Sequence, residues 1–214
     1  MKGLMVKDFL NLQSTFKRLI PIIALWMVIF LPNGNSTFFG VVIMMMTMMV
    51  VTTISYDDLA KWDSYALTMP ISRKEVVTGK YLVMLLLDVL GVLMALIVGL
   101  IGVLILKNSS WSEMMAVLVI IASIGLIAGS TMLPLIYHFG TEKARIIIIL
   151  VAMVPTGLVL LLSGMVSEQQ WQWLANIGAD ISLSMIIIGL AAFSAFYVAC
   201  SYMISKRIYE KKEF

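Results

Sequence analysis

Long apolar runs alternate with short polar connections along this chain. Six runs reach or approach the roughly 20 apolar residues that a helix needs to cross a bilayer. They cover residues 20–31, 38–56, 81–106, 114–137, 146–166 and 181–204. The runs lack the period-two alternation of barrel strands, and only helices or closed barrels satisfy the backbone in lipid. The pattern therefore predicts an all-α polytopic membrane protein, with six spans in a single transmembrane domain over residues 1–214.

Residues 1–18, before the first run, have a different pattern. Apolar residues recur there at helical spacing, and the charged residues lie mostly on other faces. The apolar positions are Met5, Phe9, Leu12 and Phe16. This pattern is typical of an amphipathic helix that lies in the membrane interface. We therefore expect an interfacial elbow helix that leads into the first span.

The composition agrees with a membrane protein. Hydrophobic residues make up 61% of the chain and the mean hydropathy is +1.02, whereas soluble domains are roughly 45–50% apolar. With six spans, every Lys and Arg except Lys107 lies on the same side as the two termini. Basic residues mark the cytoplasmic side, so we expect both termini in the cytoplasm, including a basic tail over residues 205–214. The same rule explains the pI near 9.0, which therefore indicates no nucleic-acid partner.

Residues that commonly carry catalysis or bind metals are scarce. The chain has one cysteine, Cys200, and one histidine, His138. They supply neither a metal ligand set nor a nucleophilic triad, so we expect no catalytic site and no metal site. Asp88 is the one carboxylate clearly inside a predicted span, where a charge is costly unless it is paired or hydrated. It either contacts cargo along a path or forms a structural pair.

Small residues recur every four positions in two predicted spans. They are Gly91, Ala95 and Gly99 in the third span, and Gly125 and Gly129 in the fourth. Such rows let helix backbones approach closely in a membrane. The spacing predicts tight helix packing, either within one chain or between two copies.

The connection between the second and third runs, residues 57–80, holds eight charged residues. Asp57 and Asp58 favour the start of a helix. Four apolar residues then share one helical face, and Pro70 ends the helix. These four are Leu59, Trp62, Ala66 and Met69. We expect a short cytoplasmic helix that is attached to two spans.

A second helix is predicted to follow this short one. The sequence Ser72-Arg73-Lys74-Glu75 matches the capping-box pattern, in which the first and fourth residues cap each other's backbone N–H. We expect this helix to run through Lys80 into the third span.

The connection over residues 167–180 is aromatic and is expected on the outer side. Trp171 and Trp173 with polar neighbours suit a short helix in the outer interface. They either anchor the chain there or form a lid over the exit of a pathway.

A family resemblance rests chiefly on the cytoplasmic connection. Residues 61–81, KWDSYALTMPISRKEVVTGKY, resemble the first cytoplasmic loop of small six-span permeases of the ATP-binding-cassette type-2 exporter family. Within this family the chain is most similar to a Gram-positive branch that includes the phenol-soluble-modulin exporter and antimicrobial-peptide immunity systems. Residues 1–12, MKGLMVKDFLNL, resemble the elbow helix of the family, and residues 205–214, SKRIYEKKEF, resemble its basic tail.

The resemblance implies that the 57–80 connection carries a coupling helix, which docks on an ATPase subunit. The residues expected to contact that subunit are Asp58, Lys61, Trp62, Asp63 and Tyr65. The capping residues Ser72, Arg73, Lys74 and Glu75 would then begin the third span. The resemblance also implies two permease copies with two ATPase subunits. The two copies are either a homodimer, which we expect, or a pair of related permeases.

The chain itself lacks a nucleotide-binding motif. A phosphate-binding loop requires G-x-x-x-x-G-K-[ST], and Gly79-Lys80 has neither the upstream glycine nor the following hydroxyl residue. We therefore expect no cofactor on this chain, with ATP and Mg bound by the partner subunit.

These features predict the permease subunit of an ATP-driven exporter in the plasma membrane, without an enzyme activity of its own. Apolar, methionine-rich spans with few charges suit amphipathic or hydrophobic peptides, or lipid-like cargo. Two alternatives stay open. One is a membrane sensor or scaffold that transports nothing, and the other is an ATP-independent channel or carrier that relies on Asp88.

Overall fold

The computed structural model describes residues 2–30, 37–66, 68–101, 111–141, 143–144, 146–147 and 182–211. This part of the chain is helical and contains no strand. Its helices are α1 (Lys2–Phe30), α2 (Thr37–Leu59), α3 (Trp62–Ala66), α4 (Arg73–Ile101), α5 (Trp111–Phe139) and α8 (Leu183–Lys211).

In the described ranges, five helices are long and apolar enough to cross a membrane: α1, α2, α4, α5 and α8. The predicted all-α polytopic class is thereby confirmed. Four of the five have 29 residues, which is about 43 Å of helix against a hydrocarbon core of roughly 30 Å. Their ends therefore reach the interfaces. Most of the predicted span 146–166, and all of segment 167–180, lie outside the described residues.

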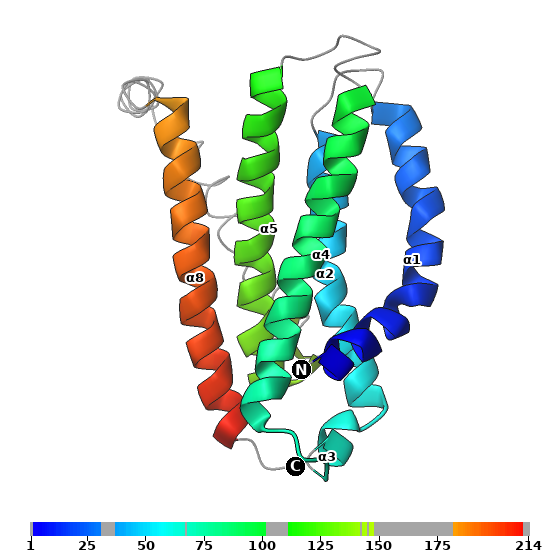
Figure 1. The fold of residues 1–214 in the computed structure, drawn as a ribbon, viewed down its shortest axis with the longest axis vertical. Coiled ribbons are helices and arrows are strands. Elements are labelled where there is room, and N and C mark those ends of the chain that lie inside the picture. The colour runs from blue at the N-terminus through cyan, green and yellow to red at the C-terminus, as the bar shows by residue number, and fades with distance from the viewer. Residues whose placement is uncertain are drawn as a thin grey trace.

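Helix α1 joins two segments that the sequence pattern separates. It is continuous from Lys2 to Phe30, and Figure 1 shows that it bends: its first turns run across the lower end of the bundle and the remainder climbs it. Leu4, Asp8 and Leu12, four residues apart, form a buried face, whereas Val6 and Leu10 are exposed. The amphipathic segment and the first span are thus one bent helix.

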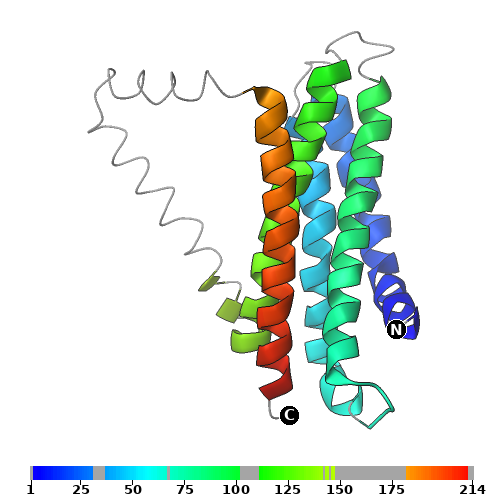
Figure 2. The ribbon, with the colours of Figure 1, turned by 60° about the vertical axis from the view of Figure 1, so that its left-hand side comes forward.

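Helix α2 is the centre of the bundle. Its most apolar window is 56% buried, against 11% for α1 and α8. It contacts α1, α4 and α5, while α8 contacts α5 and α4. Figure 2 shows α8 on the outside of this arrangement, beside α5. Helices α1 and α8 are therefore peripheral in the described bundle.

The small-residue rows lie where helices approach each other within one chain. A Cβ atom at Gly91 would lie 3.0 Å from the Ile43 Cα on α2. A Cβ atom at Gly125 would lie 2.9 Å from the Asp88 Oδ1. The first distance is tighter than nearly all real Cβ contacts and involves backbone, and the second would require the Asp88 carboxyl group to shift, so glycine permits the close approach of α4 and α5 at these positions. Of the two arrangements that the sequence allows, the structure shows packing within the chain.

Hydroxyl groups attach α8 to α4 and α5. The Tyr81 hydroxyl oxygen lies 2.6 Å from the Ser201 Oγ and 2.8 Å from the Ser205 Oγ, and Ser201 donates to the Ser130 carbonyl oxygen at 2.5 Å. Each hydroxyl has one proton, so the order of donation is Ser205 to Tyr81 to Ser201 to Ser130. Such bonds contribute roughly 0.6 to 2 kcal/mol each between membrane helices.

The start of α1, the end of α8 and helix α3 gather at one end of the bundle (Figure 1). We call this the α3 end. Helices α1 and α2 run in opposite directions, so the chain returns to the α3 end after them (Figure 1). The two predicted cytoplasmic termini therefore lie beside the predicted cytoplasmic connection.

The Gly91→Ala substitution tests the close packing of α2 and α4. We expect it to lower the free energy of unfolding by roughly 1–3 kcal/mol, because the added Cβ meets backbone atoms that cannot move aside. The matched control is Gly189→Ala on α8, where a Cβ meets nothing within 4 Å, so the better helix propensity of alanine should leave stability unchanged or raised. Unfolding in mixed micelles measures both, and equal stability of the two variants would contradict the packing.

Candidate functional site

The connection between α2 and α4 differs from the single short helix predicted from Asp57 to Met69. Asp57 and Asp58 belong to the last turn of α2, and the Lys61 N–H donates to the Asp58 carbonyl oxygen at 3.1 Å. Lys61 then has a φ of 50°, in the left-handed region, which a right-handed helix does not contain. Helix α3 follows as a separate turn of five residues. The predicted helix start at Asp57 and Asp58 is therefore wrong.

The residues before α4 form a reciprocal cap. The Ser72 N–H donates to the Glu75 Oε2 at 2.8 Å, and the Glu75 N–H donates to the Ser72 Oγ at 3.2 Å. Arg73 reaches the end of α8, where its Nη1 donates to the Glu210 carbonyl oxygen at 2.6 Å. Lys74 is exposed. The start of α4 is thus fixed locally by Ser72 and Glu75 and tied to α8 by Arg73.

Helix α3 and the end of α2 present an exposed surface. Leu59 is 82% exposed and Tyr65 is 57% exposed. Asp58 and Lys61 are also exposed, so we define these four residues as the α3 surface. Asp63 lies in α3, but its side chain is outside the part of the chain that the structure describes. An exposed aromatic residue beside an exposed leucine and two opposite charges is suited to contact with another protein.

Trp62 is oriented differently from the rest of this segment. Its ring lies 4.2 Å from the Lys7 Nζ on α1, and its centroid is 5.5 Å from that of Tyr65. The Trp62 Nε1–H is buried and has no hydrogen-bond acceptor among the described residues. Trp62 therefore links α3 to α1, in addition to any contact that it makes with a partner.

Four charged side chains meet behind Trp62, and we call them the charge network. They are Lys7 and Asp8 on α1, Asp57 on α2 and Lys80 on α4. The Asp57 carboxylate accepts from the Nζ atoms of Lys7 and Lys80, each at 2.6 Å. The Lys80 Nζ also lies 2.8 Å from the Asp8 Oδ1 and donates to the Thr53 Oγ1 at 3.2 Å.

The charge network is electrically neutral, and three of its four members are buried, while Lys7 is partly exposed. Asp8, Asp57 and Lys80 are 2%, 6% and 5% exposed. Removing one member of such a cluster leaves an uncompensated buried charge, which costs about 3–5 kcal/mol. The network thus holds three helices together directly behind α3. Because Lys7 contacts both Asp57 and Trp62, it also connects α3 to all three.

The sequence interpretation missed this network. It treated Lys7 and Asp8 as polar faces of an amphipathic helix and Lys80 as a marker of orientation. A usable signal was present: Asp8 stands four residues from both Leu4 and Leu12, on the face that these leucines bury. A charge on the apolar face of a helix requires a partner, although its spacing does not show which one.

Asp88 lies inside the bundle. It is 4% exposed, and the Thr47 hydroxyl on α2 lies 2.7 Å from its Oδ1. The absent side chain of Gly125 on α5 leaves room for this carboxyl group. Asp88 is therefore enclosed by α2 and α5, an arrangement that suits a structural pair.

Other predicted features have no geometry to report. Trp171 and Trp173 lie outside the described residues, so the anchor and lid hypotheses stay predictions. In the described segments, no three His, Cys, Asp or Glu side chains converge on a possible metal site.

Comparison with known proteins gives one result. The family model described as ABC-2 family transporter protein matches residues 3–210, which is nearly the whole chain. No curated protein and no solved structure matches the chain.

The charge network predicts an unequal response to two lysine substitutions. Lys80→Met removes a buried member and should lower the free energy of unfolding by about 3–5 kcal/mol. Lys206→Met removes one partner of the exposed pair with Glu210, 3.8 Å apart, and should cost at most about 0.5 kcal/mol. Unfolding of both variants in mixed micelles provides the comparison, and a Lys80→Met cost as small as that of Lys206→Met would show that the network is not a stabilising unit.

Proposed function

Since the chain belongs to the ABC-2 family of transporter proteins, we propose that it is a permease subunit that exports amphipathic or hydrophobic peptides with energy from a separate ATPase. The family and the spanning helices make the chain a multi-pass protein of the plasma membrane. The docking site that we propose for the ATPase is the α3 surface, which would lie in the cytoplasm together with both termini.

One observation carries the docking proposal: the residues of the α3 surface are exposed, yet helix α3 itself is attached to the bundle through Trp62 and Ala66. Tyr65 and Leu59 are free of the bundle, whereas Trp62 contacts Lys7 and Ala66 is buried. A force on α3 therefore passes through Lys7 and the charge network to α1, α2 and α4. Small movements of the ATPase would in this way tilt several helices together.

ATP and Mg would be bound entirely by the partner. Gly79 and Lys80 are the nearest approach to a phosphate-binding sequence in this chain. Both are buried inside α4, and the Lys80 Nζ is occupied by Asp8 and Asp57. Lys80 thus has a structural role that is incompatible with holding a nucleotide phosphate.

The complete transporter would contain two copies of this chain and two ATPase subunits. Six predicted spans form half of the membrane unit that the family resemblance implies. The exposed apolar faces of α1 and α8 supply surface for lipid or for the second copy, since 11% of each spanning window is buried.

The proposed cargo follows from the low charge of the spans. Met44, Met45 and Met48 in α2 are partly exposed and offer adaptable apolar contacts, whereas Met46 and Met49 are buried in the core. An amphipathic peptide or a lipid-like molecule needs such contacts, whereas a sugar or an ion needs polar ones. Asp88 is already engaged by Thr47, so no observation favours a carrier that depends on this carboxyl group.

The α3 surface is tested by the double variant Lys61→Glu/Tyr65→Ala. The protein would be co-expressed with a candidate ATP-binding-cassette ATPase and reconstituted into liposomes. We expect the affinity for the ATPase to fall roughly 30-fold, because an exposed tyrosine at an interface centre contributes about 2 kcal/mol or more. ATP-dependent export of a labelled amphipathic peptide should fall with it, while stability stays unchanged.

The control for this experiment is Lys17→Glu, because Lys17 is exposed and lies outside the α3 surface. Tyr209 at the same end is fully buried and is left unchanged. Lys17→Glu alone should leave affinity and export intact. Undiminished binding by Lys61→Glu/Tyr65→Ala would refute the docking surface. Peptide movement without ATP would favour a carrier, and an ATPase that neither binds nor responds would favour a scaffold.

Lys7→Gln separates docking from transmission. The variant keeps the α3 surface but removes the cation between Trp62 and Asp57, so we expect unchanged affinity for the ATPase and fewer peptides exported per ATP hydrolysed. Measuring binding, ATP hydrolysis and export on the same liposomes gives this ratio. An unchanged ratio would mean that force reaches the spans by another route.

A further inference from the structure

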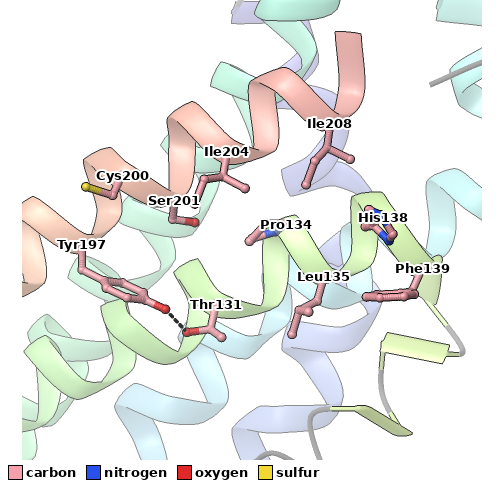
Figure 3. Close-up of a pocket in the computed structure, with 10 residues that line it drawn as sticks. All are labelled: Thr131, Pro134, Leu135, His138, Phe139, Tyr197, Cys200, Ser201, Ile204 and Ile208. Carbon is pink, nitrogen blue, oxygen red and sulfur yellow. Dashed lines mark hydrogen bonds between the residues drawn. The ribbon is translucent and has the colours of Figure 1, made fainter. Parts of the chain in front are cut away.

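An apolar groove runs along the outside of the bundle where α5 and α8 meet. It has a volume of about 410 Å³. Figure 3 shows its walls, which include Pro134 and Leu135 on α5 and Cys200 and Ile204 on α8. At one end of the groove, the hydroxyl groups of Thr131 and Tyr197 form a hydrogen bond with an oxygen–oxygen distance of 3.1 Å. The interior of the groove therefore offers contact mainly to an apolar ligand.

A second hollow of about 420 Å³ continues the groove towards the α3 end. The two hollows share His138 and Ile208 in their linings, so they adjoin each other along the surface of α5 and α8, and we call the two together the channel. The lining of the second hollow adds Arg207 and Lys211, one helical turn apart on α8. The groove is thus apolar along most of its length and basic at one end.

The two basic residues are available to an external anion. Among the described residues, no carboxylate lies within 4.0 Å of the Arg207 or Lys211 side chain. Lys206, the neighbour of Arg207 on α8, is instead paired with Glu210 at 3.8 Å. The basic end of the groove therefore carries two positive charges without a described counterion.

The dimensions match one leaflet of a membrane. Tyr197 and Lys211 mark the two ends of the channel, and the helix between them is about 21 Å long at 1.5 Å per residue. Half of a bilayer, with its headgroups, is about 20 to 22 Å thick. With its basic end at the interface, the channel would place its apolar part at the depth of the acyl chains.

We propose that this groove binds one phospholipid with an anionic headgroup. An acyl chain lies along Pro134, Leu135 and Ile204, and the phosphate contacts Arg207 and Lys211. Basic pockets between membrane helices select anionic headgroups in this way. Two positive charges without a counterion among the described residues favour a net negative lipid over a zwitterionic one, because its headgroup supplies the opposite charge. The proposal requires only the position of α5 and α8 in a membrane, so it is independent of the ATPase docking site.

Cys200 permits a direct test, because it is the one cysteine in the chain and lines the apolar part of the groove. A small fluorophore attached there reports an acyl chain that carries a nitroxide quencher. Full-length protein would be titrated in nanodiscs with quencher-labelled phosphatidylglycerol or phosphatidylcholine. We expect half-maximal quenching by phosphatidylglycerol at a roughly 30-fold lower mole fraction, from two basic contacts.

The variants distinguish a specific site from general contact with lipid. Arg207→Gln/Lys211→Gln should abolish the preference for phosphatidylglycerol. Lys17→Gln/Lys206→Gln removes two positive charges outside the groove lining and should retain the preference. Native mass spectrometry of unlabelled protein should show one retained phosphatidylglycerol, lost in the first variant and kept in the second.

Three outcomes would overturn the proposal. Equal quenching by both lipids, unaffected by the variants, would indicate ordinary membrane contact. Absence of quenching by either lipid would indicate that protein, from this chain or a second copy, fills the groove. Loss of the preference on addition of inorganic phosphate would indicate that the basic end binds a soluble anion.

Discussion

The charge network of Lys7, Asp8, Asp57 and Lys80 is the interaction on which the α3 end depends. Lys7 and Asp8 lie 3.4 Å apart on α1. Every other ion pair of the network joins two different helices. An uncompensated charge at this depth costs several kcal/mol. Helices α1, α2 and α4 therefore have to meet at one point, which fixes the bent start of α1 against the two helices that flank α3.

The rest of the described bundle is held by weaker contacts. Lipid chains are as apolar as leucine, so burial of apolar surface does little to bring membrane helices together. Glycine at position 91 instead permits the close approach of α2 and α4, and the hydroxyl chain through Tyr81 and Ser201 attaches α8. The strongest connection between helices thus lies directly behind the exposed α3 surface. This is the arrangement that a subunit needs if it is to receive force at that surface and pass it to its spans.

The two sides of the bundle differ in a way that suits different partners. At the α3 surface, Tyr65 and Leu59 project away from the bundle, as contacts for a protein do. Between α5 and α8, apolar walls lead to the two positive charges of Arg207 and Lys211, an arrangement suited to a lipid. The ion pair network separates the first surface from the bundle core, and the hydroxyl chain lies beneath the second. Each surface can therefore be altered without disturbing the contacts that hold the helices together.

Features that depend on residues close together in the chain could be predicted before the fold was known. Apolar runs specified the membrane helices, because length and composition decide insertion, and Ser72 with Glu75 specified the start of α4, because the two cap each other across three positions. The helix start predicted at Asp57 and Asp58 was wrong, because Lys61 adopts a left-handed backbone conformation that separates α2 from α3. The local sequence pattern does not predict that conformation.

Contacts between residues far apart in the chain became apparent only from the packing of the helices. Asp57 lies 50 residues from Lys7 in the chain, and Lys80 lies 72 residues from Asp8. The groove between α5 and α8 likewise joins His138 to Arg207 from two separate helices. Helical periodicity shows that a charge such as Asp8 is on a buried face, but it carries no information about the partner. That partner is set by how the helices pack, and the amino-acid sequence alone does not give the distances between helices.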